Sequence, residues 1–189
     1  TIAMMRAVLL AVYFLAGATR AAQPPQDIDI SFVSVPLCAG NPSADCLECA
    51  NGPTCPALNS TITFAGGLYM RAPSVPTFGG FSAIRVSSDA SSFVAASDEG
   101  SLLFAHLVHD AQGRLVGVKG AKIAPLLDPD GKALSEDSAR GSDRLSDAEG
   151  LAVTNLTDLL SGDLFVSFER IHRVWRYPFG SGGGFSARP

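Results

Sequence analysis

Charge is scarce in this 189-residue sequence, and long apolar runs are nearly absent. It holds 14 Lys and Arg against 18 Asp and Glu, which gives a formal net charge of −4. Because Lys and Arg never gather into a basic block, we expect no nucleic-acid partner. The one marked apolar run, AVLLAVYFLA at residues 7–16, is too short to cross a bilayer core as a helix. No stable membrane span is therefore expected once this run is cleaved.

The sequence also lacks the short motifs of several large hydrolase classes. It contains no G-x-S-x-G, no G-x-x-x-x-G-K-[ST] and no H-E-x-x-H. A nucleophile elbow, a P-loop and a helical zinc-protease site are therefore not indicated. If the chain is an enzyme, we expect its nucleophile to be water activated by a metal ion.

The apolar run has the context of a secretory signal peptide. Arg6 supplies a positive charge before it, and Ala16-Gly17-Ala18 after it matches the small-x-small cleavage pattern. A membrane anchor is the alternative, which the length of the run disfavours. We interpret residues 1–18 as a signal peptide and 19–27 as a linker, and we expect a secreted or extracytoplasmic protein.

All four cysteines lie in one short stretch, CAGNPSADCLECANGPTC at residues 38–55. In an exported protein, Cys38, Cys46, Cys49 and Cys55 predict two disulfides, and three connectivities stay open. Half a zinc site on the C-x₂-C pair is the alternative, but no His lies nearby. We interpret the stretch as a disulfide-stapled loop.

Frequent Gly and Pro and short apolar alternations indicate an all-β domain over residues 28–189. Residues 128–146 are polar and irregular, and they predict a long loop. Strands are expected at 28–35, 62–64, 68–70, 81–86, 92–97, 102–109, 114–118, 150–153, 163–168 and 173–177.

Part of this pattern occurs twice. Residues 84–99 and 151–170 each contain a strand, a turn, a second strand and a charged tip, and each is followed by a further apolar strand. A four-stranded blade repeated about an axis gives this signature. We therefore predict a partial β-propeller. The set of blades is expected to be incomplete, since a propeller needs about four to eight of them.

Charged residues gather where the expected strands end, and in a propeller such ends share a face. Ca²⁺ is bound by six to eight oxygens, which carboxylates on loops can supply. We predict Asp147, Glu149 and Asp98 as metal ligands and Ca²⁺ as the cofactor. The alternative for Asp98 is a plain turn closed by Gly100.

The stretch ERIHR at 169–173 is the other part of the predicted site. Glu169, Arg170 and His172 are the predicted catalytic residues. His172 is the only His beside acids and arginines, and so it is the candidate acid or base. Arg170 and Arg173 are predicted to bind an anionic substrate group such as phosphate in a fork. A cross-strand ion pair between Glu169 and Arg173 at a hairpin tip is the alternative.

Several segments between residues 78 and 180 resemble, in order, the secreted phytase-like family known for the esterase-like activity of phytase. They are FGGFSAIRVSSDASSFVAASDEG, RLVGV, IAPLLDPDGKAL, SDAEGLAV and LFVSFERIHRVWRYPFG. The resemblance implies a β-propeller and an exported hydrolase related to calcium-dependent phytases. The positions that match the motif of the family are 147–150, 168–170 and His172-Arg173. Glu99 departs from the family, which commonly has an Arg there, and this changes the sign of the charge at that loop.

Together these features predict an exported phytase-like or esterase-like hydrolase that acts on small phosphate or carboxylic esters with a divalent cation. We expect the chain to be the N-terminal part of such a protein. Two alternatives stay open. One is a non-catalytic extracellular β-propeller that binds ligands or proteins, and the other is an inactive fragment.

Overall fold

The computed structural model describes residues 25–34, 67–134, 145–181 and 184–189. This part of the chain consists of β-strands, turns and two short 3₁₀ helices, and no α-helix occurs in it. The predicted signal peptide, the predicted strand at 62–64 and all four cysteines lie outside the described residues. The strands are β1 Gln26–Asp27, β2 Ser31–Ser34, β3 Leu68–Arg71, β4 Phe81–Val86, β5 Ser92–Ser97, β6 Ser101–His109, β7 Leu115–Pro125, β8 Ala148–Val153, β9 Leu164–Phe168 and β10 Arg173–Tyr177.

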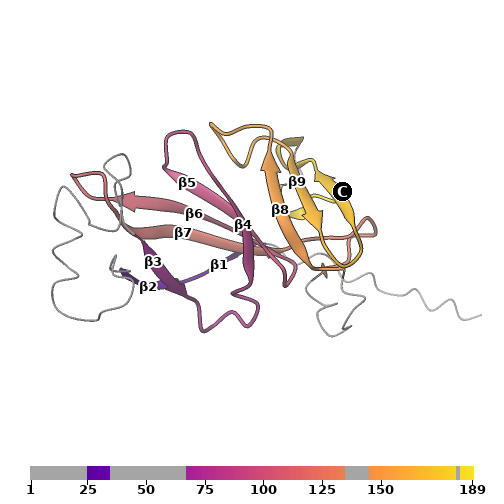
Figure 1. Cartoon of the computed structure of the whole chain (residues 1–189), viewed down its shortest axis with the longest axis horizontal. Coiled ribbons are helices and arrows are strands. Elements are labelled where there is room, and N and C mark those ends of the chain that lie inside the picture. The colour runs from indigo at the N-terminus through magenta and orange to yellow at the C-terminus, as the bar shows by residue number, and fades with distance from the viewer. Residues whose placement is uncertain (1–24, 35–66, 135–144, 182–183) are drawn as a thin grey trace, which may run out of the picture.

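The strands form antiparallel sheets whose order mostly follows the chain (Figure 1). The larger sheet has the order β1-β7-β6-β5-β4, in which β4 to β7 are joined as a meander. The smaller sheet has the order β10-β9-β8, and β2 pairs with β3 in a two-stranded ribbon. The all-β prediction is confirmed. Among the described residues no helix is long and apolar enough to cross a membrane.

Two of the described strands differ from the sequence prediction by more than two residues at one end. The strand expected at 114–118 continues to Pro125, because its second half pairs both with β6 and with the short β1. The strand expected at 28–35 is observed only as β2 at Ser31–Ser34, and β1 at Gln26–Asp27 is a separate short strand that was not expected. As a result, Gln26 and Asp27, which we had assigned to the linker, belong to the larger sheet.

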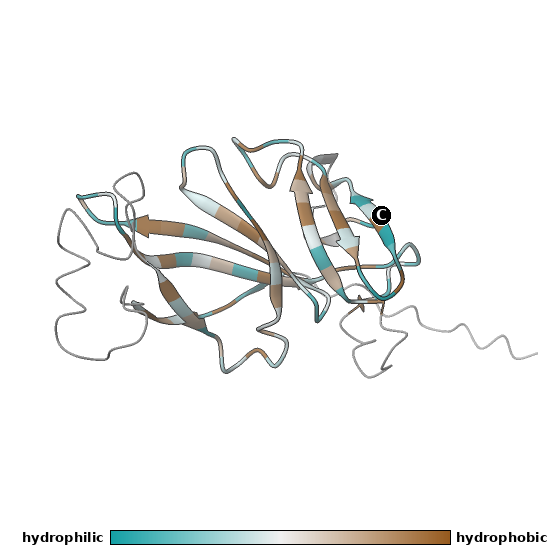
Figure 2. Ribbon diagram, in the orientation of Figure 1, coloured by the Kyte–Doolittle hydropathy of each residue, from teal (hydrophilic) through white to brown (hydrophobic). Residues whose placement is uncertain are grey.

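The hydrophobic core lies on both faces of β5, whose six residues are all buried. On one face Val94 and Ala96 join a cluster with Leu151, Leu164 and other buried residues of the smaller sheet. On the other face Phe93 and Ala95 pack with a second cluster around Leu103. Figure 2 shows apolar stretches along the strands of both sheets. The shared cluster is expected to hold the smaller sheet against the larger one, since burial of apolar area is the main stabilising term.

Tyr177 links β10 to the segment that follows β7. Its side chain is 1% exposed, and its hydroxyl donates a hydrogen bond to the Leu127 carbonyl at 2.9 Å. Burial raises the pKa of Tyr177 well above its usual range. Leu127 in turn bridges to Ala133, so the first residues of the predicted 128–146 loop form an ordered turn.

The internal repeat seen in the sequence is present in the backbone. Asp98 donates its amide to the Gly80 carbonyl, and Glu169 donates its amide to the Asp147 carbonyl, both at 2.8 Å. The strand after each acceptor contains a bulge at its second residue, Ser82 in β4 and Glu149 in β8. The first hairpin, β4–β5, therefore shares this hydrogen bond and this bulge with the second, β8–β9, at the end that carries the charges.

Candidate functional site

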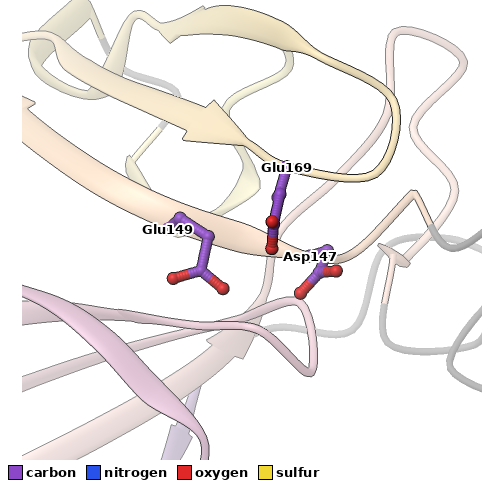
Figure 3. A group of neighbouring side chains, drawn as sticks. All are labelled: Asp147, Glu149 and Glu169. Carbon is purple, nitrogen blue, oxygen red and sulfur yellow. The ribbon is translucent and has the colours of Figure 1, made fainter.

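Three carboxylates meet at the end of the smaller sheet where β8 begins and β9 ends. One oxygen each from Asp147, Glu149 and Glu169 lie within 4.8 Å of one another. Figure 3 shows Glu169 reaching from the hairpin tip toward the two acids of the neighbouring strand. Asp147 is buried, whereas Glu149 and Glu169 are exposed. The group is thus anchored on one side and open to solvent on the other.

A β-bulge at the start of β8 helps to shape this group. Ala148 pairs with Phe168 and Gly150 pairs with Ser167, so Glu149 is an extra residue with no partner in the register. The bulge changes the alternation of the strand, because the buried residues are Ala148 and Leu151, three positions apart. Glu149 is therefore carried on a kinked and locally twisted segment beside Asp147.

The tip of the β9–β10 hairpin supplies the third acid. Glu169 is the first residue after β9, and residues 169–172 form the turn into β10. Its amide bond to the Asp147 carbonyl fixes the backbone of the tip against the start of β8. Asp147 and Glu169 are 22 positions apart in the sequence, and this backbone hydrogen bond makes them neighbours.

Arg170 neutralises part of the negative charge of the group. Its Nε donates to Oδ2 of Asp147 at 2.9 Å, and the Asp147 side chain is only 10% exposed. The Arg170 side chain is 55% exposed, so the guanidinium also faces solvent. Three carboxylates and one arginine leave a net charge of about −2 if all are ionised. Such an arrangement can attract a divalent cation and also contact an anionic group beside it.

Arg173 lies differently from the sequence prediction. Its Nη1 donates to the Ile171 carbonyl at 2.8 Å and its Nη2 donates to the Leu145 carbonyl. The guanidinium also lies over the rings of Phe168 and Trp175. Within the described residues it forms no ion pair, so the alternative of a Glu169–Arg173 pair is not found there. Its role in substrate binding stays a prediction.

Asp98 and His172 are not members of the carboxylate group. Asp98 is the counterpart of Glu169 in the first hairpin, where it follows β5 and lies over Gly80. His172 is exposed in the turn before β10. Among the predicted metal ligands, the described structure therefore groups Asp147 and Glu149, and it adds Glu169, which we had predicted as catalytic.

The spacing of the three oxygens fits one cation of the size of Ca²⁺. Ca²⁺–oxygen distances are about 2.3–2.6 Å, so two oxygens on one ion are at most about 4.6–5.2 Å apart. The oxygens of the group all lie within 4.8 Å of one another, so they are close enough to bind one such ion. A Ca²⁺ ion takes more than three ligands, which the second carboxylate oxygens, carbonyls or water can provide. The donor set is entirely oxygen, which suits a hard cation better than zinc.

Comparison with protein-family models identifies the family. The model described as Phytase-like, esterase-like activity of phytase, matches residues 76–188, which is more than half of the chain. The chain belongs to the phytase-like family. The matched region contains both hairpins and the whole carboxylate group. No curated protein and no solved structure matches this member of the phytase-like family.

The sequence did not indicate the bulge at Glu149 or the contacts of Arg173. A bulge leaves no fixed residue signature, although the non-alternating run Asp147-Ala148-Glu149-Gly150 was a possible sign of one. The position of Arg173 between two aromatic residues, Phe168 and Trp175, is compatible with cation–π contacts once the strand register is known. That register is set by the hairpin length, which the sequence gives only approximately.

Proposed function

We propose that the protein is an exported hydrolase that acts on small phosphate or carboxylic esters with the help of a divalent cation, Ca²⁺ in the first instance. The observation that carries the proposal is the convergence of Asp147, Glu149 and Glu169 beside an arginine in a chain of the phytase-like family. The oxygen-only donor set supports a hard cation. The predicted signal peptide supports export, and the cysteine-rich loop is consistent with it.

In this proposal each residue of the group has a defined task. The three carboxylates hold the cation, which when bound would polarise the ester and activate water. Arg170 orients the Asp147 carboxylate through their ion pair, and its exposed guanidinium edge contacts an anionic oxygen of the substrate. His172 remains the candidate for moving a proton at the tip.

We also propose that the two meanders are blades of a β-propeller. Three features support this reading: the meander order of each sheet, the repeated bulge and the repeated hydrogen bond at the hairpin end. β4 and β8, the first strands of the two hairpins, also contact each other. Neighbouring blades of a propeller place their equivalent strands side by side in this way.

Ester hydrolysis by the full-length protein tests the proposed function. Release of phosphate from phytate and cleavage of a p-nitrophenyl ester are measured with Ca²⁺, with EDTA, and after Ca²⁺ is restored. We expect turnover of at least one substrate that is lost in EDTA and regained with Ca²⁺. Absence of cation-dependent turnover on both substrates would reject a hydrolase, and ligand binding without turnover would favour the binding-module alternative.

A further inference from the structure

Arg173 occupies the junction between the two segments that carry the acids. It is the first residue of β10 and lies opposite Phe168, the last residue of β9. Its guanidinium carbon lies 3.8 Å from the ring centroid of Phe168 and 4.2 Å from that of Trp175. The two rings contact each other edge to face, with centroids 5.2 Å apart. The arginine is thus held over an aromatic pair and has little freedom to turn toward solvent.

The two Nη groups of this side chain donate to backbone carbonyls on both sides of the carboxylate group. Nη2 donates to the carbonyl of Leu145, two residues before Asp147, and Nη1 donates to that of Ile171, two residues after Glu169. Arg173 is partly buried, and this burial lowers the pKa of its guanidinium. A single planar group therefore bridges the segment leading into β8 and the hairpin tip.

We infer that Arg173 is a positioning residue that keeps Asp147 and Glu169 at the spacing that one divalent cation requires. The inference rests on the proposed function, because it assumes that the spacing of these acids serves to bind a cation. The amide bond between Glu169 and Asp147 is one tie between the two segments, and Arg173 is the second. Lys cannot replace it, because an ammonium on a flexible stem lacks the planar fork that reaches two carbonyls while stacked on a ring.

The test compares Arg173→Met and Arg173→Lys with Arg176→Met in the full-length protein. Met keeps apolar contact with the two rings, which protects the fold. Arg176 is the matched control because it lies on the same strand and pairs with Asp163 instead of the site. By calorimetric titration with Ca²⁺, both Arg173 variants are expected to bind about tenfold more weakly or worse, as for loss of an outer-shell partner. The control is expected to stay within about twofold of wild type, since exposed ion pairs contribute little.

A second readout needs no metal. Hydrogen exchange of the Glu169 amide, which donates to Asp147, is measured in Ca²⁺-free protein. We expect exchange about tenfold faster in Arg173→Met and Arg173→Lys, because local opening of the tip becomes easier. Exchange of core amides such as that of Val94 is expected to be unchanged, which separates loosening of the site from general destabilisation.

The two readouts separate the failure of this inference from that of the proposed function. If wild-type protein binds no Ca²⁺, the metal proposal fails, and the Glu169 amide still decides whether Arg173 holds the tip. If Arg173→Met leaves both affinity and exchange unchanged, the inference is wrong. If Arg173→Lys matches wild type, the argument from the planar fork is wrong. Should Arg173→Met fail to fold, the Lys variant carries the same comparison.

Discussion

Asp147→Asn is expected to weaken Ca²⁺ binding by the full-length protein about 100-fold or more and to reduce cation-dependent ester hydrolysis in parallel. The substitution keeps the shape of the side chain but removes the charge of the buried member of the group. It also releases Arg170, whose charge then adds to the repulsion of an incoming cation. Loss of an outer-shell partner alone costs about 10- to 100-fold in metal affinity. Loss of a carboxylate that contacts the ion is expected to cost at least that much.

Asp163→Asn is the matched control for this experiment. Asp163 also pairs with an arginine, Arg176, at 2.8 Å, and its side chain is also partly buried, at 22% exposed. The Asp to Asn change keeps the side-chain shape here as well, but Asp163 lies at the other end of β9, just before Leu164. We expect its Ca²⁺ affinity to stay within about twofold of wild type, since a surface pair is worth little. Equal losses in both variants would show that general destabilisation, and not the site, explains the result for Asp147.

Gly80→Ala is expected to lower the free energy of unfolding by about 2–5 kcal/mol. Gly80 has a φ of +58°, in the left-handed region that an L side chain adopts at a cost of about 1–2 kcal/mol. A β-carbon there would also collide with the carboxyl of Asp98. Displacing a packed group typically costs about 1–3 kcal/mol more. Denaturant unfolding, with the midpoint and slope compared to wild type, measures the effect.

Gly113→Ala isolates the backbone part of this cost. Gly113 has a φ of +77°, but a β-carbon there would meet nothing within 4 Å. It is therefore expected to destabilise by only about 1–2 kcal/mol. If Gly80→Ala costs no more than Gly113→Ala, then Asp98 moves aside freely and its contact with Gly80 does not constrain the first hairpin.

The contrast between the two hairpins explains why the acids gather in only one of them. Where the second hairpin has Asp147 and Glu149, the first has Gly80 and Ser82 at the equivalent positions. Only the tip acid is present in both, as Asp98 and Glu169. At these three equivalent positions the second copy therefore carries three carboxylates and the first carries one, while Glu99 of the first copy stands where the second has Arg170.

Much of the fold could be predicted because local patterns determine it. β4 and β5 have the predicted bounds, and β6, β8, β9 and β10 differ from them by at most two residues, since turn residues flank each alternating run. Glu149 and Glu169 were expected to meet only if the ends of repeated strands shared a face, whereas they are adjacent because β8 and β9 pair within one sheet. Asp98 was grouped with them because equivalent tips were expected to converge. Without the strand register, the sequence could not show that Asp98 lies apart from the carboxylate group of the second hairpin.

The length of β7 and the role of Arg173 were not predictable for a related reason. The second half of β7 pairs with the first half of β6 and, at Lys122 and Ile123, also with β1. The contact with β1 joins residues about a hundred positions apart, which no local pattern encodes. Arg173 depends on three separate segments, the one before β8, the end of β9 and the middle of β10. From the sequence, the charged hairpin tip indicated only that Arg173 is a polar residue near the turn, and not which segments it contacts.

The most direct test of the central claim is to locate the cation by anomalous scattering in crystals of the full-length protein grown with Ca²⁺ or a lanthanide substitute. The account predicts one strong peak within about 2.3–2.6 Å of oxygens from Asp147, Glu149 and Glu169. A strong peak bound by other residues, with these three carboxylates unliganded, would contradict it.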